Sequence, residues 1–179
     1  MRTLKLTGQV VALAAVAGML ALLVWRLTHQ SHPPKIGGPA PQFSARRMDG
    51  DGTITLASLR GKPVVLNFWA SWCNPCKSEA AKLEQAWQQY RRQGVVFVGI
   101  DYNDVTSDAR TFVDRHGVTY PVVSDGSGMI GDRYGLSGVP ETYFVNRRGR
   151  LVGAHILGPI TDPKWLAVFK EGIRAALRS

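Results

Sequence analysis

Apolar segments rich in β-branched residues alternate with helical patterns along most of this chain. The apolar segments cover residues 64–69, 95–102, 120–124, 142–146 and 151–157. Helical patterns over residues 75–92 and 105–116 separate the first three, and strands that alternate with helices form parallel sheets. Arg147-Arg148-Gly149 joins the last two segments as an antiparallel hairpin. The sequence therefore predicts an α/β domain with a central mixed sheet flanked by helices.

The predicted helices each have one apolar face. Helix 75–92 places Leu83, Trp87 and Tyr90 on one side, and a last helix at 162–177 carries an apolar stripe that includes Phe169 and Ile173. Thr161 or Asp162 is expected to cap this last helix, with Pro163 in its first turn. Upstream of the sheet, Asp-Gly turns at residues 49–52 predict a small N-terminal β-hairpin.

The N-terminal segment differs in composition from the rest of the chain. Residues 10–25 contain no polar side chain, and Arg2 and Lys5 precede them. This length and charge pattern predicts a signal-anchor transmembrane helix at residues 1–27, with the rest of the chain outside the cytoplasm. Because no small-residue cleavage site follows, the anchor is expected to remain uncleaved. Residues 28–41, rich in Pro, Gly and His, predict a linker, and residues 42–179 form the domain.

The chain's two cysteines, Cys73 and Cys76, lie three residues apart between a predicted strand and a predicted helix. Two cysteines cannot provide the disulfide framework of a small secreted domain, which favours a catalytic pair. A thiolate at a helix N-terminus is stabilised by free backbone N–H groups and the helix dipole. Cys73 is therefore the expected nucleophile, and Cys76, one turn later, the resolving thiol.

Several other functions do not fit the residues. Lys77 follows Cys76 where a c-type haem attachment site requires His, and the four histidines show no paired ligand spacing, so neither haem nor a metal is expected. The formal net charge is +9, but no basic stripe with interleaved aromatic residues is present, so no nucleic acid partner is expected.

Three stretches carry a family resemblance. They are GPAPQF at residues 38–43, LRGKPVVLNFWASWCNPC at 59–76 and YGLSGVPET at 134–142. From Ile36 onward the chain resembles the thioredoxin superfamily, and within it the membrane-anchored thiol–disulfide oxidoreductases of cytochrome c maturation, the DsbE, ResA and TlpA group. This resemblance implies a thioredoxin-like fold with an extra strand and helix at residues 95–116.

The resemblance also implies roles for single residues. The Val139–Pro140 bond is expected to be cis and beside the dithiol, where the Val139 backbone can pair with a substrate chain. Trp72, Asn74, Pro75 and Glu141 complete the expected substrate-binding set.

One position departs from general thioredoxin. The buried Asp that assists the resolving cysteine there is replaced by Asn67, which cannot take a proton. The resemblance places an acid at Glu79, and a nearby carboxylate can accept the proton of Cys76. Glu79 is therefore the third expected catalytic residue, with Glu141 a weaker candidate for the same role.

The function implied is extracytoplasmic protein disulfide reduction at the bacterial inner membrane. The expected substrate is the CxxCH pair of apocytochrome c, and the expected electron donor is a membrane protein that relays electrons from cytoplasmic thioredoxin. The protein is expected to act as a monomer, with the Cys73–Cys76 disulfide as its sole redox group. Three alternatives stay open: a reductase for a copper-site assembly protein or oxidase subunit, a thiol peroxidase, and a non-catalytic apocytochrome holdase.

Overall fold

The computed structural model describes residues 13–25 and 32–178, in two compact units that divide between Ser31 and His32. Residues 13–25 form a helix with exposed apolar side chains. The start of the predicted anchor, with Arg2 and Lys5, and the first part of the predicted linker lie outside the described residues. None of the described helices combines the length and the apolar character needed to cross a membrane.

The second unit is built on a five-stranded mixed sheet, as predicted. Its strand order is β5-β4-β3-β6-β7. The strands β3, β4 and β5 pair in parallel. On the other side of β3, β6 runs antiparallel to β3, and β7 runs antiparallel to β6. The strands are β3 (Val64–Trp69), β4 (Val96–Tyr102), β5 (Val122–Asp125), β6 (Glu141–Val145) and β7 (Leu151–Ile156).

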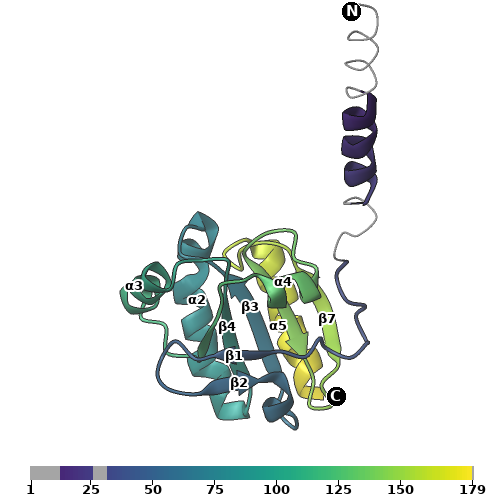
Figure 1. The fold of residues 1–179 in the computed structure, drawn as a ribbon. Helices are drawn as coiled ribbons and strands as arrows, with labels where there is room; N and C mark the ends of the chain where they lie inside the picture. Colours follow the sequence, from purple (N-terminus) through teal and green to yellow (C-terminus); the bar gives the residue numbers. More distant parts are fainter. Residues whose placement is uncertain (1–12, 26–31, 179) are drawn as a thin grey trace, which may run out of the picture. The chain divides into compact units, whose positions relative to one another are not determined.

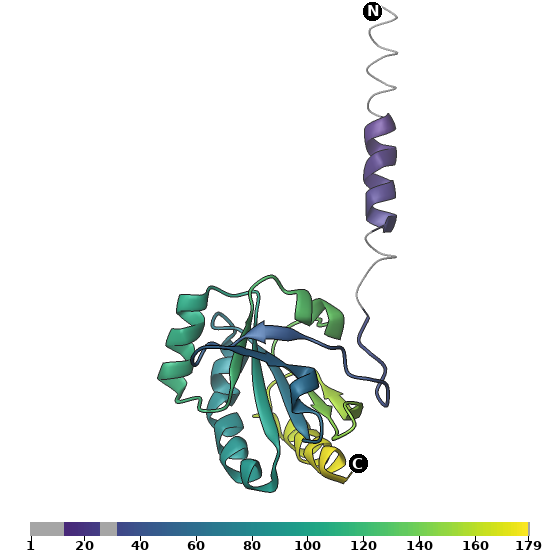
Figure 2. The ribbon, with the colours of Figure 1, turned by 60° about the horizontal axis from the view of Figure 1, so that its bottom comes forward.

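The two faces of the sheet are covered differently. Val65 and Trp69 of β3 face a core formed with α2 (Asn74–Tyr90), α3 (Thr106–His116) and α5 (Pro163–Arg178). Val64, Leu66 and Phe68 point the other way, as the alternation of a strand requires, into a second core. Figure 1 shows the hairpin strands crossing the front of this second face, and Figure 2 shows α2 and α5 along the first.

The second face is closed by short elements. The predicted hairpin is confirmed as β1 (Ser44–Arg46) paired with β2 (Thr53–Thr55), followed by the 3-10 helix η1 (Leu56–Leu59). The short helix α4 (Met129–Tyr134) contributes Ile130 and Tyr134 to the same core. The sequence analysis did not predict α4 or η1, because elements of six and four residues are too short to establish a periodicity.

The predicted extra strand and helix are also present. Between α2 and Pro140 the chain forms two strand–helix units, β4–α3 and β5–α4. The last helix starts as predicted, because Asp162 Oδ1 accepts the backbone N–H of Lys164 at 2.8 Å.

Strand direction determines where the functional loops lie. The parallel strands β3, β4 and β5 all end at one edge of the sheet, and the antiparallel β6 begins there, since Glu141 pairs with Phe68. The segment after β3 carries the cysteines, and the segment before β6 carries Pro140. Two parts of the chain that are far apart in sequence therefore meet at this edge.

Candidate active site

Cys73 is the N-cap residue of α2. Its backbone is extended (φ −82°, ψ 108°), and its Sγ accepts the backbone N–H of Cys76 at 3.1 Å. Pro75 in the first turn lacks an N–H and suits this position. A sulfur that accepts from a free N–H at a helix N-terminus is stabilised as the thiolate. This geometry matches the role of nucleophile expected for Cys73.

Cys73 and Cys76 are joined as a disulfide, with their Cα atoms 5.3 Å apart. Cys76 is 1% exposed and Cys73 is 4% exposed. Both residues are therefore buried, Cys76 slightly more than Cys73, and the role of Cys76 as the resolving thiol stays a prediction.

The loop before β6 faces the dithiol. The Val139–Pro140 bond is cis, as predicted, and the Cys73 Sγ lies 3.5 Å from the Val139 carbonyl oxygen. A cleft of about 280 Å³ runs beside it, lined by Pro75, residues 137–141 and residues 157–159. Val139, which lines this cleft, has its carbonyl oxygen next to the Cys73 sulfur.

The other predicted substrate-contact residues surround the dithiol. Trp72 is 58% exposed, and its indole N–H donates to the Asn103 carbonyl at 3.4 Å. Asn74 is exposed, and its side chain accepts from Lys77 at 3.1 Å. The structure thus brings Trp72, Asn74 and Pro75 to the surface around the dithiol.

Glu79 lies one turn beyond Cys76 on the buried face of α2 and is 1% exposed. Its Oε2 accepts the backbone N–H of Ile160 at 2.8 Å, and its Oε1 accepts from the Asn67 amide at 3.1 Å. Burial raises the pKa of Glu79 to about 7, although these two hydrogen bonds favour the charged form. A carboxyl group with this pKa can exchange a proton near neutral pH.

Asn67 of β3, which donates to Glu79, is 3% exposed. Its amide group also donates to the Thr142 hydroxyl at 3.1 Å, while its Oδ1 has no hydrogen-bond partner among the described residues. Since an amide does not titrate, Asn67 orients Glu79 without competing for its proton.

The Glu141 side chain binds the loop that precedes it and His155 of β7. Its Oε1 accepts from the Ser137 and Gly138 backbone N–H groups and from the Ser137 hydroxyl, and its Oε2 lies 2.7 Å from His155 Nε2. Glu141 is 2% exposed. Burial acts to raise the pKa of Glu141, but the hydrogen bonds from His155 and Ser137 outweigh it, so that the pKa is lowered. The contacts make Glu141 a brace for the segment that carries Val139 and Pro140. Its contact with substrate stays a prediction.

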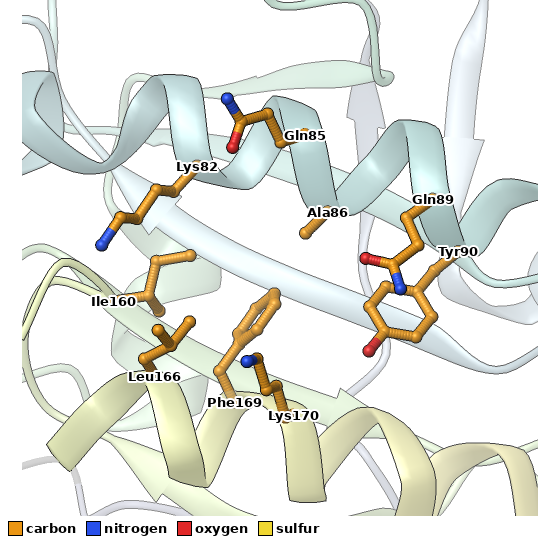
Figure 3. Close-up of a pocket in the computed structure, with 9 residues that line it drawn as sticks. All are labelled: Lys82, Gln85, Ala86, Gln89, Tyr90, Ile160, Leu166, Phe169 and Lys170. Carbon is orange, nitrogen blue, oxygen red and sulfur yellow. The ribbon is translucent and has the colours of Figure 1, made fainter. Parts of the chain in front are cut away.

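Several residues of the site escaped the sequence analysis. His155 and Ile160 bind the predicted acids Glu141 and Glu79, from which they lie 14 and 81 positions away. Thr142 accepts a hydrogen bond from Asn67, 75 positions away. A further cavity of about 210 Å³ lies between α2 and α5 (Figure 3) and contains none of the predicted site residues. The Ile160 side chain lines this cavity while its backbone N–H binds Glu79. No local sequence pattern signals such contacts.

Comparison with known proteins agrees with this geometry. A model of the AhpC/TSA family matches residues 36–154. The chain belongs to the AhpC/TSA family. It is 30% identical over 144 residues to the thiol-disulfide oxidoreductase ResA of Oceanobacillus iheyensis, a match that covers 79% of this chain and 75% of ResA.

Solved structures place this AhpC/TSA protein in the same group. A thioredoxin-family thiol:disulfide interchange protein of Chlorobium tepidum superposes with a TM-score of 0.67 at 30% identity, over 80% of this chain and 99% of that one. A secreted disulfide oxidoreductase of Mycobacterium tuberculosis, described as homologous to DsbE of E. coli, gives 0.62 at 29% identity over 72% and 96%. The expected thioredoxin-like fold and the ResA and DsbE grouping are confirmed.

The active site and the relatives agree on the chemistry. The protein is a thiol–disulfide oxidoreductase whose redox group is the Cys73–Cys76 pair. Across residues 13–25 and 32–178, no three His, Cys, Asp or Glu side chains come together as a metal site would require.

Proposed function

We propose that this oxidoreductase works outside the cytoplasm as a protein disulfide reductase that keeps the CxxCH cysteines of apocytochrome c reduced for haem attachment. The observation that carries the proposal is the buried Glu79 behind the dithiol. An acid with a pKa of about 7 can accept the proton of the resolving thiol, and so favours release of a reduced substrate. The relatives named thiol-disulfide oxidoreductase ResA support thiol–disulfide exchange at this dithiol, and the direction of transfer is part of the proposal.

The exchange proceeds in two steps. The Cys73 thiolate attacks one sulfur of the substrate disulfide, which forms a mixed disulfide and releases the other substrate sulfur as a thiolate. Cys76 then loses its proton towards Glu79 and attacks Cys73, which breaks the mixed disulfide. The substrate gains two electrons, and the enzyme is left with the Cys73–Cys76 disulfide.

The cleft beside Pro140 is the proposed docking site for the substrate chain. The Val139 backbone lies next to Cys73 Sγ, and the cleft continues past Leu157, which is 55% exposed. An extended peptide held there brings a disulfide close to Cys73 while its backbone pairs with the loop. Trp72, which precedes Cys73 and is 58% exposed, provides an apolar contact surface.

The oxidised enzyme must be reduced again to act repeatedly. We propose a membrane protein that passes electrons from cytoplasmic thioredoxin as the donor, and residues 1–27 as a single-pass anchor in the inner membrane. The apolar run at residues 10–25, preceded by Arg2 and Lys5, supports this topology. The Mycobacterium tuberculosis relative, described as secreted, supports an extracytoplasmic site. The protein is proposed to act as a monomer.

A trapping experiment tests the proposal. The Cys76→Ser variant, expressed in cells, should accumulate the mixed disulfide between Cys73 and its substrate, because the resolving thiol is missing. Recovery of a CxxCH peptide supports apocytochrome c as the substrate. Recovery of a copper-binding protein instead would assign the site to copper-site assembly.

The matched control replaces both cysteines by serine. This variant should trap nothing and should fail to complement a deletion strain in cytochrome c assembly. If it complements as well as the natural chain, the protein is a holdase and its dithiol is dispensable.

A further inference from the structure

Helix α3 belongs to the extra strand–helix unit that the sequence predicted, and the mechanism above gives it no role. It lies beside α2 (Figure 1), and residues of both helices line a cleft of about 280 Å³, called here the α3 cleft. From α3 the lining includes Asp108, Thr111, Phe112 and Arg115. These four positions follow the helical spacing i, i+3, i+4 and i+7, so one face of α3 forms a wall of the cleft.

The α3 cleft borders the segment that carries the dithiol. Its other lining residues include Ser71, two positions before Cys73, and Lys77, directly after Cys76. In the sheet, β3 lies between β6, which follows the loop of Pro140, and β4, which precedes α3. The cleft of Pro140 and the α3 cleft therefore flank the dithiol segment, one on the β6 side of β3 and the other on the β4 side.

The α3 cleft carries an unbalanced positive charge. Lys77 and Arg115 are both exposed, and neither forms an ion pair with a carboxylate of the described residues. The Lys77 ammonium group donates instead to the neutral side chain of Asn74 at 3.1 Å. Asp108 is the one carboxylate among the described residues that line the cleft. Two cations and one carboxylate give a net charge of 2 − 1 = +1, without any charge on His116.

The position of Lys77 is unfavourable for a cation in the free protein. Lys77 stands in the first turn of α2, which contains no acidic side chain. The free N–H groups and the positive end of the dipole at a helix N-terminus favour anions and repel cations. An anion bound in the α3 cleft would therefore offset a repulsion that no side chain of this first turn relieves.

The apolar part of the cleft is held rigidly. The Phe112 ring is 7% exposed and stacks on Trp69 with ring centroids 4.3 Å apart, while the His116 ring packs against it at 4.5 Å. Ser71 is fixed as well, because its hydroxyl donates to Asp104 at 3.0 Å. The cleft thus combines a fixed aromatic surface with two cations, which suits a side chain that has methylene groups and a terminal carboxylate.

We infer that the α3 cleft binds an acidic side chain of the protein substrate, close in sequence to the substrate disulfide. The carboxylate pairs with Lys77 and Arg115, and the methylene groups contact Phe112. The inference rests on the proposed function, since it requires a protein substrate at the dithiol. It gives α3 a role in substrate choice, in which acidic residues beside the disulfide are favoured over basic ones.

A matched set of disulfide peptides tests the preference. The peptides share one length and one internal Cys-x-x-Cys disulfide, and they carry Glu, Gln or Lys on both sides of it. The natural chain should reduce the Glu peptide with a kcat/KM about fivefold above that of the Gln peptide, in the range of an exposed ion pair. The Lys peptide should be the slowest. High salt should remove these differences, because it screens exposed charges.

A charge reversal identifies the cleft. Arg115→Glu leaves one cation and two carboxylates in the lining, so this variant should prefer the Lys peptide to the Glu peptide. The matched control is Arg110→Glu, which makes the same change of charge at an exposed position of the same helix. Arg110 lines a different cavity, so the control should keep the preference for the Glu peptide.

Binding is measured separately from turnover. Peptides with serine in place of cysteine are titrated into the natural chain, and the amide resonances of Ser71 and Thr111 are followed by NMR. Equal affinities for the Glu and Lys peptides would overturn the inference, as would an Arg115→Glu variant that still prefers the Glu peptide. Failure to reduce any disulfide peptide would count against the proposed reductase function instead, and the binding titration would still decide whether the acidic subsite exists.

Discussion

The side-chain amide of Asn67 donates a hydrogen bond to the Glu79 carboxyl group at 3.1 Å, across the contact between β3 and α2. The resemblance to thioredoxin places an Asp at the position of Asn67. Here the titrating group stands on the helix that carries the cysteines, and the strand supplies a neutral donor. Asn67 and Ile160 hold Glu79 in place from both sides, and we propose that Glu79 controls protonation near the dithiol.

The two cysteines should differ in their effect when replaced. Cys73→Ser is expected to reduce dithiothreitol-dependent disulfide reduction to the uncatalysed rate, because the thiolate at the helix N-terminus is the attacking group. Cys76→Ser should still attack once and then stop at the mixed disulfide. Reductase assays and mass spectrometry of the product distinguish the two. A Cys73→Ser variant that keeps full activity would show that the nucleophile is assigned wrongly.

Glu79→Gln should slow the resolving step at neutral pH. An amide retains the shape and can accept one of the two hydrogen bonds from Asn67 and Ile160, but it cannot accept the Cys76 proton. We expect a loss of about a hundredfold in the rate of mixed-disulfide resolution, in the range typical of general base catalysis. In the natural chain this rate should rise with pH through about 7, where Glu79 loses its proton. Stopped-flow measurement from pH 5 to pH 9 should show that rise, and its persistence in Glu79→Gln would contradict the role.

The raised pKa of Glu79 also predicts how stability depends on pH. The folded state holds the Glu79 proton up to about pH 7, whereas an exposed Glu loses it near pH 4.5. The stabilisation is therefore fully present below pH 4.5 and is lost as pH rises through about 7. The loss should be on the order of 3 kcal/mol in the free energy of unfolding. Denaturant titrations at pH 5 and pH 8 measure it, with Glu79→Gln as the control that lacks this dependence.

Glu141→Ala should loosen the loop that carries Pro140. The change leaves the Ser137 and Gly138 N–H groups and His155 without their acceptor. Buried donors without a partner cost about 2 kcal/mol of unfolding free energy, and a less ordered loop should raise the KM for a protein substrate. The control is Glu171→Ala, which removes an exposed acid of α5 that binds Arg178 and should leave the stability nearly unchanged. Equal effects of the two substitutions would mean that Glu141 does not brace the loop.

The rate of peroxide turnover tests whether this protein acts as a thiol peroxidase. With a common reductant, we expect disulfide reduction to be much faster than peroxide consumption, because Cys76 can resolve a mixed disulfide with Cys73, three residues away on the same helix. The two rates are measured side by side on the same preparation. Peroxide consumption equal to disulfide reduction would favour the peroxidase alternative.

Much of the fold followed from local patterns. The strand at residues 64–69 has the predicted bounds, and Asp162 caps the last helix as expected. The helix predicted at residues 75–92 extends from Asn74 to Tyr90. The predicted strand at residues 120–124 starts two residues later, at Val122, because Pro121 lacks the N–H that a strand ladder needs. Helix α4 was not predicted, because its turn of glycines and its short length give no apolar period.

The candidate site also has features that local sequence patterns predict and features that they do not. The sequence by itself determined the reactive pair, since Cys73-Asn74-Pro75-Cys76 at a helix start specifies both the spacing of the sulfurs and the N–H group that stabilises the thiolate. Only the tertiary structure decided which groups surround that pair. Glu79 obtains its raised pKa from burial between β3 and the segment of Ile160, and Asp104 binds Ser71 because β4 ends at the same edge as β3. Such properties depend on desolvation and on contacts between distant segments, and neither is set by neighbours along the chain.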